Sequence, residues 1–248
     1  MDLNLTGQNV AVFGSSNGIG RAIAEGFIAE GCHVRGFDRV PCDGIETTVG
    51  DVTGYDEVQA FAAQFERVDH LVFCVGVGSG KFGFPFWNLE PGDWPRVLHI
   101  NLIGAVNAAH AFAPKLIERG NGSMLFLVSV AGQIGSQTDP PYSAAKAGLI
   151  NFTQCAAKDL APHGIRVNAL SPGMVQTNLN EAVWAAGQAR LPELQRQTYA
   201  AWADEKIRKS HPSAAGKPPP SMPPWPPSSP ATMVATSPAK RSTSTAVR

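Results

Sequence analysis

Long apolar runs and an excess of either charge are absent from this sequence. No stretch of the 248 residues approaches the roughly 18 consecutive apolar residues that cross a bilayer, and the start lacks a basic segment followed by an apolar one. Lysine plus arginine equals aspartate plus glutamate at 20 each, so no net field attracts nucleic acid or an acidic membrane surface. We therefore expect a cytoplasmic protein that binds a small molecule, with neither nucleic acid nor a membrane as its partner.

Cysteine is also scarce, and its four residues are too scattered for a metal site or a redox pair. No Cys-x-x-Cys spacing occurs among Cys32, Cys42, Cys74 and Cys155. This pattern excludes the common zinc and thioredoxin-like motifs and is typical of proteins in a reducing compartment. We expect no metal at the functional site.

Short apolar runs do occur, and they alternate with longer segments of helical periodicity. This alternation predicts parallel strands joined by right-handed helical crossovers, in a single α/β domain with a doubly wound, Rossmann-like sheet. The predicted strands are 9–13, 33–37, 71–75, 124–128 and 165–170, and the predicted helices are 20–30, 56–65, 94–119 and 142–161.

A glycine-rich loop follows the first predicted strand and opens a helix. Glycine allows the turn and a close approach of the backbone, and N–H groups at a helix start can bind a dinucleotide pyrophosphate. Taken alone, such a loop is about as often an ordinary strand-to-helix turn. The residues predicted to bind the cofactor here are Gly14, Ser16, Asn17, Gly18, Ile19 and Gly20.

Acidic residues after the next two strands extend this interpretation. Asp38 ends the second strand, where a carboxylate accepts hydrogen bonds from ribose hydroxyls and repels a 2′-phosphate. The sequence therefore predicts NAD rather than NADP, although Arg39 beside it can contact a phosphate. Asp51 and Val52 follow the third strand and are predicted to lie beside the adenine, and a surface turn is an equally good interpretation of these two alone.

Candidate acid/base residues lie on the last long helix. Tyr142 and Lys146 are one turn apart, so both head groups can act on one site, and a neighbouring cation favours the phenolate. Ser129 ends the strand before it, and its hydroxyl can hold a substrate oxygen. Asn101, in the preceding long helix, can supply an amide that fixes a water. By itself, the Tyr-Lys pair is usually only one face of an amphipathic helix.

Taken together, these motifs resemble the short-chain dehydrogenase/reductase family, over residues 5 to about 212. The resemblance implies that Asn101, Ser129, Tyr142 and Lys146 are the catalytic residues, with Lys146 also bonding the nicotinamide ribose. It implies homo-oligomers as well, since relatives form tetramers. The further cofactor contacts that it implies, several of them at the nicotinamide carboxamide, are Cys74, Gly76, Pro172, Gly173, Val175 and Thr177.

Two positions depart from the family pattern. The family usually has threonine where Phe13 stands, and Asn-Asn-Ala-Gly where this chain has Phe73, Cys74, Val75 and Gly76. The asparagines normally tie neighbouring strands together, so we expect Phe73 and Cys74 to repack this region with apolar contacts. Cys74 is expected to be buried filler rather than a nucleophile.

The implied reaction is hydride transfer between NAD(H) and a secondary alcohol or ketone, with Tyr142 as the general acid/base. Residues 178–210 are the expected substrate lid. Aromatic residues in the lid and in the loop before it hint at an apolar or cyclic alcohol, but packing of the lid and of an oligomer interface accounts for them equally well. These residues are Phe82, Phe84, Phe86, Trp87, Trp184, Tyr199 and Trp202.

The composition changes after Pro212, where the family continues with a helix and a last strand but this chain is rich in proline. We expect a domain over residues 1–212 and a disordered tail over 213–248. Synonymous codons for the tail, reread after one lost base, encode a family-like ending, so a frameshift is the leading hypothesis. A genuine disordered tail and a polyproline ligand are the alternatives.

A changed ending has physical consequences, and it leaves a second functional hypothesis open. A missing strand leaves a sheet edge unpaired and a missing helix uncovers apolar surface, which puts stability and tetramer formation in doubt. The alternative function is therefore a catalytically impaired or inactive nucleotide-binding protein of the same family. An enoyl reductase is disfavoured because it prefers a wider tyrosine-lysine spacing.

Overall fold

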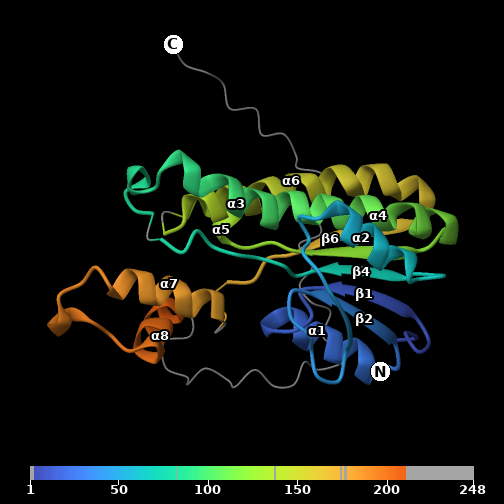
Figure 1. Ribbon diagram of the computed structural model, residues 1–248, viewed down its shortest axis with the longest axis horizontal. Coiled ribbons are helices and arrows are strands. Elements are labelled where there is room, and N and C mark those ends of the chain that lie inside the picture. The colour runs from blue at the N-terminus through green and yellow to red at the C-terminus, as the bar shows by residue number, and fades with distance from the viewer. Residues whose placement is uncertain (1–2, 82, 137, 174, 176–177, 211–248) are drawn as a thin grey trace, which may run out of the picture.

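The computed structural model describes residues 3–81, 83–136, 138–173, 175 and 178–210 of the chain. Its centre is a six-stranded sheet in the order β3-β2-β1-β4-β5-β6, in which every neighbouring pair is parallel (Figure 1). The fold is therefore a Rossmann-like, doubly wound α/β domain, as the sequence predicts. The strands are β1 (Asn9–Phe13), β2 (His33–Asp38), β3 (Glu46–Val49), β4 (His70–Phe73), β5 (Gly122–Leu127) and β6 (Ile165–Leu170).

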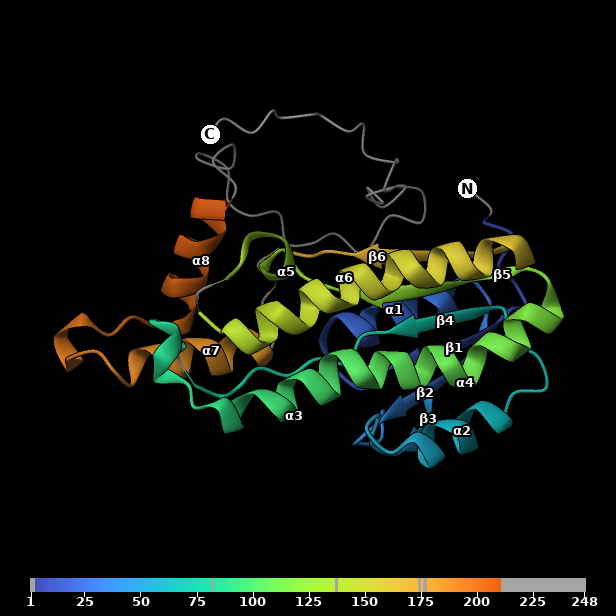
Figure 2. The same cartoon turned by 90° about the horizontal axis from the view of Figure 1, so that it is seen from above.

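Helices cover both faces of this sheet. Figure 1 shows α2, α4 and α6 on one face and α1 on the other, and Figure 2 shows α4 and α6 running side by side. Helices α7 and α8 pack against each other beyond the sheet. The helices are α1 (Gly18–Ala29), α2 (Tyr55–Ala63), α3 (Trp94–Leu98), α4 (Gly104–Arg119), α5 (Ala131–Ile134), α6 (Pro140–Leu160), α7 (Asn178–Gln188) and α8 (Tyr199–Ser210). Short turns form η1 (Phe86–Asn88), η2 (Pro91–Asp93), η4 (Ala161–His163) and η5 (Glu193–Gln195).

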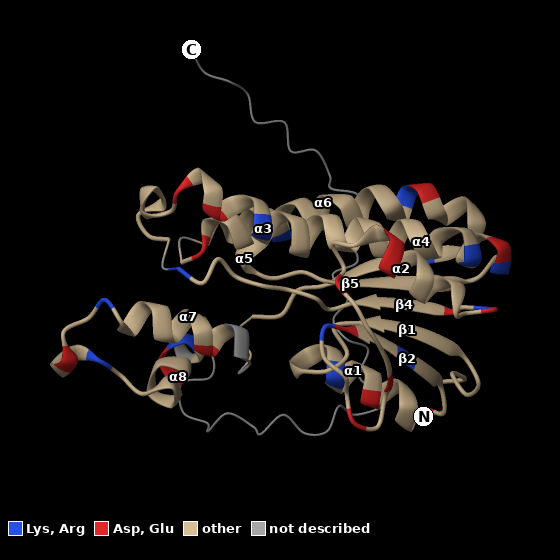
Figure 3. Cartoon of the chain, viewed as in Figure 1, with Lys and Arg blue, Asp and Glu red and all other residues tan. Residues whose placement is uncertain are grey.

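The central strands are apolar after their first residue because the helices bury them on both faces. All four residues of β4 are buried, as are the last four of β1. A parallel sheet covered on both sides has no solvent face, so its strands contain apolar runs rather than an alternating pattern. Charged side chains lie mainly on helices and loops (Figure 3).

Phenylalanine rings join β1 to its neighbours at the positions where the sequence departs from the family. The Phe13 ring centroid lies 5.1 Å from that of Phe37, 5.3 Å from Phe61, 6.0 Å from Phe73 and 5.8 Å from Phe112. All five side chains are fully buried. The expected apolar repacking around Phe73 is therefore confirmed.

The predicted single helix over 94–119 is wrong, because a π-helical turn divides it. This turn, η3 (His99–Ile103), separates α3 from α4 and contains Asn101. The Asn101 Nδ2 atom donates to the backbone oxygens of Val77 and Val97, each at 2.8 Å. A side chain that bonds to the preceding turn competes with the helical ladder, which favours a local π distortion.

Strand β6 is the outermost strand in the described part of the chain, since it pairs with β5 alone. Residues 211–248, where the sequence departs from the family pattern, lie outside the described residues. The disordered tail and the frameshift therefore stay predictions. Within the described residues, none of the helices has the length and apolar character needed to cross a membrane.

Candidate active site

One cavity of about 1170 Å³ extends along the carboxyl ends of the strands. Glycines after β1, polar residues after β2 and β5, and the first turns of α6 all line it. Doubly wound sheets bind ligands at this edge, where the strand order reverses on either side of β1. Seventeen of the predicted site residues line the cavity, although they come from separate parts of the chain: Gly14, Asn17, Gly18, Ile19, Gly20, Asp38, Arg39, Asp51, Val52, Cys74, Gly76, Ser129, Tyr142, Lys146, Pro172, Gly173 and Val175.

The glycine-rich loop forms a cradle that a larger side chain would fill. Gly14 has a φ of +81°, and a Cβ there would lie 3.0 Å from the backbone of Cys74. A Cβ on Gly20 would lie 2.0 Å from the Gly14 oxygen, and Gly18 at the start of α1 has a φ of +55°. The loop therefore presents bare backbone at a helix N-terminus, which suits a phosphate group.

Asp38 lies at the end of β2, with its carboxylate held by backbone N–H groups. Oδ2 accepts from the Ser16 N–H at 3.0 Å, and Oδ1 accepts from the Arg39 N–H at 2.7 Å. The Ser16 hydroxyl donates to the Val40 oxygen at 2.7 Å, so this side chain supports the Asp38 loop and does not line the cavity. Ser16 thus lies one layer behind the position that the sequence predicts.

Asp51 and Val52 line the cavity after β3. The Thr53 N–H and hydroxyl both donate to Asp51 Oδ1, and the Thr53 backbone hydrogen bond lowers the pKa of the Asp51 carboxyl. The Val52 oxygen accepts from Asn107 Nδ2 at 2.9 Å, which ties this turn to α4. Both residues are therefore fixed within the cavity wall.

Tyr142 lies in the first turns of α6, directly across from Ser129 at the end of β5. The two side chains form a hydrogen bond. Burial raises the pKa of the Tyr142 phenol above its usual value, while the hydrogen bond with Ser129 acts in the opposite direction. The Ser129 Oγ atom also accepts from the Ala131 N–H at 3.1 Å, which fixes the hydroxyl.

Lys146 is on the same face of α6 but is directed to the end of β5. Its Nζ atom donates to the Leu127 oxygen at 2.8 Å and lies 5.6 Å from the centroid of the Tyr142 ring. The side chain is only 1% exposed, and burial lowers the pKa of its ammonium to about 8. The expected lowering of the tyrosine pKa by this cation is therefore wrong for this structure, because burial outweighs it.

Asn101 lies behind the cavity wall rather than in it. Its side-chain oxygen accepts from the Val77 N–H at 3.3 Å and lies 3.2 Å from where a Cβ on Gly76 would be. The same Cβ would lie 3.5 Å from Lys146 Nζ, so the asparagine and the lysine approach each other across this glycine. Two backbone oxygens already use both Nδ2 hydrogens, so the side-chain oxygen is the atom that remains able to fix a water.

Cys74 lines the cavity beneath the glycine loop, next to Lys146. Burial raises the pKa of its thiol to about 12. A thiol with so high a pKa is protonated at neutral pH, which agrees with the expectation that Cys74 is not a nucleophile, but the residue is half-buried rather than fully buried. Across the residues that the structure describes, no cluster of three or more His, Cys, Asp or Glu side chains is arranged to hold a metal ion.

The segment after β6 closes the cavity from the other side. Pro172, Gly173 and Val175 line the wall, and the Pro172 oxygen accepts from the Val130 N–H at 3.3 Å. The buried Ser171 hydroxyl faces this region and has no hydrogen-bond partner within the described residues. Thr177, predicted to contact the carboxamide, lies outside the described residues.

The aromatic residues give little support to an apolar substrate pocket. Phe84, Phe86 and Trp87 are 48%, 66% and 69% exposed and do not line the cavity. Trp184 and Trp202 pack on either side of Tyr199, and of these three only Trp202 reaches the cavity. The alternative interpretation, packing within the lid, describes the lid aromatics better, and Phe82 lies outside the described residues.

Several polar residues that line the cavity were not predicted from the sequence. They lie in the α5–α6 connection and in the lid helices. Asp139 could have been predicted, because an aspartate directly before Pro-Pro-Tyr is typical of a helix N-cap. The missed residues are Ser136, Thr138, Asp139, Asn180 and Lys206.

Comparisons with known proteins agree with this geometry. The sequence profile described as short chain dehydrogenase matches residues 8–188. Nodulation protein G of Azospirillum brasilense is 32% identical over 195 residues, which cover 71% of this chain and 78% of that protein.

Solved structures match over a similar span. Ligand-free aldohexose dehydrogenase of Thermoplasma acidophilum has a TM-score of 0.71 at 27% identity, covering 84% of this chain and 80% of its own. A candidate NAD(P)-dependent gluconate 5-dehydrogenase of Beutenbergia cavernae, with NADP bound at low occupancy, has a TM-score of 0.67 at 28% identity. It covers 82% of this chain and 89% of its own.

Proposed function

Since the chain belongs to the short-chain dehydrogenase family, we propose that it transfers a hydride between NAD(H) and a secondary alcohol or ketone, with Tyr142 as the general acid/base. The observation that carries the proposal is one shared cavity. At one end of this cavity lies the glycine-rich loop, whose bare backbone suits a phosphate. At the other end lies Tyr142, which is hydrogen-bonded to Ser129 and has the Lys146 ammonium 5.6 Å from the centroid of its ring. A protein that binds a nucleotide but catalyses no reaction does not need Tyr142, Ser129 and Lys146 in this arrangement.

The cavity fits a dinucleotide in three respects. Its volume exceeds the range of about 300–1,000 Å³ that accommodates drug-sized ligands, which leaves room for a substrate as well. The backbone at Gly14 and Gly20 leaves no space for a Cβ, so a phosphate can approach the bare backbone where α1 begins. The buried Ser171 hydroxyl has no hydrogen-bond partner among the described residues, so it can form a hydrogen bond with a ligand in the cavity.

When bound, the nicotinamide supplies the acceptor or donor of the hydride. In the oxidation direction, Tyr142 Oη removes the proton of the alcohol, and in reduction it returns one. Ser129 donates a hydrogen bond to the substrate oxygen and holds it beside the phenol. Lys146 and the Asn101 oxygen lie on the side of Gly76, where they provide a route for the proton toward solvent through a water.

Asp38 supports NAD over NADP. A carboxylate at this position, held by the N–H groups of Ser16 and Arg39, accepts ribose hydroxyls and repels a 2′-phosphate. Arg39 also lines the cavity and is the feature that favours NADP. Homo-oligomer formation, a cytoplasmic location and the domain limits remain predictions from the sequence.

The reaction is tested by following the absorbance of reduced nicotinamide with a panel of cyclic, aliphatic and polyhydroxylated alcohols, using NAD and NADP in parallel. Polyols belong in the panel because the structural relatives are described as acting on aldohexose and gluconate. Reduction of NAD by at least one secondary alcohol is expected. Equal or better turnover with NADP would overturn the assignment of NAD.

The second candidate, an impaired nucleotide-binding protein, is favoured by the departure of the sequence from the family after Pro212. A thermal melt with and without NAD separates the candidates from an unfolded product, because a ligand of the native state raises Tm. A Tm increase without turnover on any substrate supports the impaired protein. A Tm increase with turnover supports the enzyme.

A further inference from the structure

Asp139 is a buried carboxylate at the wall of the cavity, three residues before Tyr142. It is the N-cap of α6 and is only 6% exposed. Among the described residues, no lysine, arginine or histidine forms an ion pair with it. A buried acidic group is costly without a cation, so its hydrogen bonds decide what it does.

The two carboxylate oxygens join separate segments. Oδ2 accepts from the Ser79 N–H at 2.7 Å, on the loop that follows β4, and Oδ1 accepts from the Tyr142 N–H at 3.5 Å. The same loop meets the start of α6 a second time, where the Gly83 N–H donates to the Thr138 oxygen at 2.9 Å. Asp139 thus fixes the turn of helix that carries the phenol against one wall of the substrate site.

Charged and titratable groups reach the Tyr142 region from four elements. Lys146 is on α6 itself, Cys74 follows β4, Lys206 comes from α8, and Arg96 of α3 donates to the Gly78 oxygen at 3.4 Å. Burial is the largest cause that raises the pKa of the phenol, the bond with Ser129 lowers it, and the charge of Asp139 raises it to a smaller extent. Burial raises the pKa of the Asp139 carboxyl as well, and the N–H groups of Ser79 and Tyr142 oppose that shift.

Resting on the proposed function, we infer that Asp139 is a positioning residue for Tyr142, which it holds by joining the loop after β4 to α6 while placing a negative charge beside the phenol. Two consequences are separable. The hydrogen bonds fix where the tyrosine lies, and the charge shifts the pH at which it loses its proton.

Asp139→Asn removes the charge but keeps a side chain that caps helices well. The acidic limb of the kcat/KM profile for alcohol oxidation should move to lower pH by about half a unit to one unit, with the plateau kcat within about threefold of the parent. Asp139→Ala removes both the hydrogen bonds and the charge, so its plateau kcat should fall about tenfold. Asp139→Asn, which keeps a capping side chain, should show little of this loss.

Asp93→Asn is the matched control. Asp93 also caps a helical turn, accepts from the Glu90 N–H and pairs with Lys81, but it does not line the cavity. Its pH limb should stay where the parent has it. An equal shift in this control, or an unmoved limb in folded Asp139→Asn, would overturn the inference. If Asp139→Asn does not fold, Asp139→Ser replaces it, because serine also caps without charge.

A second readout separates this inference from the proposed function. The chain has three tyrosines, so the difference in phenolate absorbance between the parent and Tyr142→Phe follows Tyr142 without any turnover. The midpoint should move to lower pH in Asp139→Asn. A moved midpoint in a protein without dehydrogenase activity supports the inference while the proposed function fails. Activity with an unmoved midpoint overturns the inference alone.

Discussion

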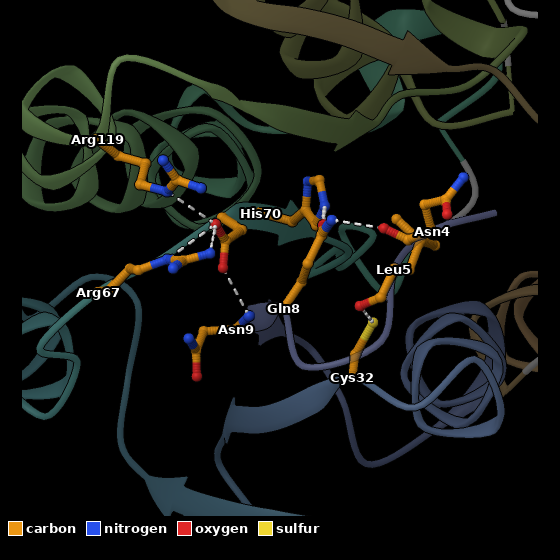
Figure 4. A network of polar contacts seen from close by, with 9 residues as sticks. Asn4, Leu5, Gln8, Asn9, Cys32, Arg67, His70 and Arg119 are labelled. Atoms are coloured by element: carbon orange, nitrogen blue, oxygen red, sulfur yellow. Dashed lines mark hydrogen bonds and ion pairs between the residues drawn. The ribbon is translucent and has the colours of Figure 1, made fainter.

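The two ends of the parallel strands use polar side chains in different ways. At the amino end of β4, both carboxylate oxygens of Asp69 have protein partners. Its Oδ1 atom lies 2.8 Å from Arg67 Nη2 and 3.2 Å from Arg119 Nε, and Oδ2 accepts from the Asn9 N–H at 2.9 Å. Figure 4 shows Arg67, Arg119 and Asn9 gathered by these contacts, which join three segments of the chain.

His70 continues this network. Its Nδ1 atom bonds with Ser123 Oγ at 2.8 Å and its Nε2 atom with Gln8 Oε1 at 2.5 Å, while the ring stacks on Phe27. Burial lowers the pKa of the imidazole. Both ring nitrogens are occupied, so this histidine is a structural residue and not an acid/base candidate.

The carboxyl ends of the strands are less complete. After β6, the Ser171 hydroxyl lines the cavity and is buried without a hydrogen-bond partner in the described part of the chain, and the ammonium of Lys146, beside the end of β5, has a pKa lowered to about 8. Polar groups that a protein buries without satisfying are typical of functional sites. The comparison teaches that satisfied polar atoms indicate stability, whereas unsatisfied ones indicate where a ligand belongs.

The largest expected effect is loss of activity at the carboxyl end. Tyr142→Phe removes the proton-transferring oxygen but keeps the ring, so kcat should fall about a thousandfold while Tm stays within about 2 °C of the parent. Steady-state rates and a thermal melt measure the two. Turnover near the parent level in a folded, NAD-binding variant contradicts both the proposed role and the comparison.

At the amino end, the effect should be on stability instead. Asp69→Asn should lower the free energy of unfolding by about 2 kcal/mol, because Asp69 is 7% exposed and the loss leaves two arginines without their partner. This figure lies below the range of about 3–5 kcal/mol for fully buried pairs because both arginines are partly exposed. Urea denaturation measures it, and kcat per folded molecule should not change.

Glu25→Gln is the control for this variant. It breaks the Arg21–Glu25 pair, whose side chains are 44% and 56% exposed, and should leave the urea midpoint unchanged within the precision of the measurement. If both variants lose a similar amount of unfolding free energy, the contacts of Asp69 contribute no more to stability than an exposed ion pair does.

A smaller effect is expected at the cofactor end of the cavity. Asp38→Asn removes the charge that repels a 2′-phosphate, so the ratio of kcat/KM for NAD to that for NADP should fall about tenfold, or about 1.4 kcal/mol. Parallel assays with the two cofactors measure the ratio. An unchanged ratio means that Asp38 does not discriminate between them.

The smallest effect concerns His70 and acid. A buried imidazole with a lowered pKa stays neutral in the folded protein while the unfolded chain takes up a proton below about pH 6.5. His70 therefore contributes stability that is present above that pH and is lost as the pH falls toward the folded-state pKa, by at most about 1.4 kcal/mol per pH unit. His70→Gln should flatten this slope in urea titrations between pH 6.5 and 5, and an equal slope in the variant contradicts the assignment.

Much of the fold could be predicted because its signals are local. The apolar runs gave all five strands predicted with bounds, β1, β2, β4, β5 and β6, within two residues at each end, and the order of Gly14, Gly18 and Gly20 marked the phosphate cradle. The spacing of Tyr142 and Lys146 placed both on one helix face, and the structure brings them to one cavity.

The remaining features depend on contacts between distant segments. The π turn at Asn101 arises where that side chain meets Val77, 24 residues away, and Asp139 meets Ser79 across 60 residues. The bond from Lys146 to the Leu127 oxygen is equally non-local and redirects the ammonium from the phenol. No periodicity within a single element contains this information.

The wider turn between α3 and α4 also constrains how this chain can vary in length. The π turn holds one residue more than an α-helical stretch of the same rotation, so removing one residue from His99–Ile103 would restore a regular α-helix and leave α3 and α4 facing nearly as they do now. What would be lost is the position of Asn101, whose side chain bonds the Val77 and Val97 oxygens. A deletion within α4 itself would instead rotate the rest of that helix by roughly 100° and turn its buried side away from the sheet. The local irregularity thus accommodates one extra residue without a change of phase, and changes of length should be tolerated best in the exposed loop before α3.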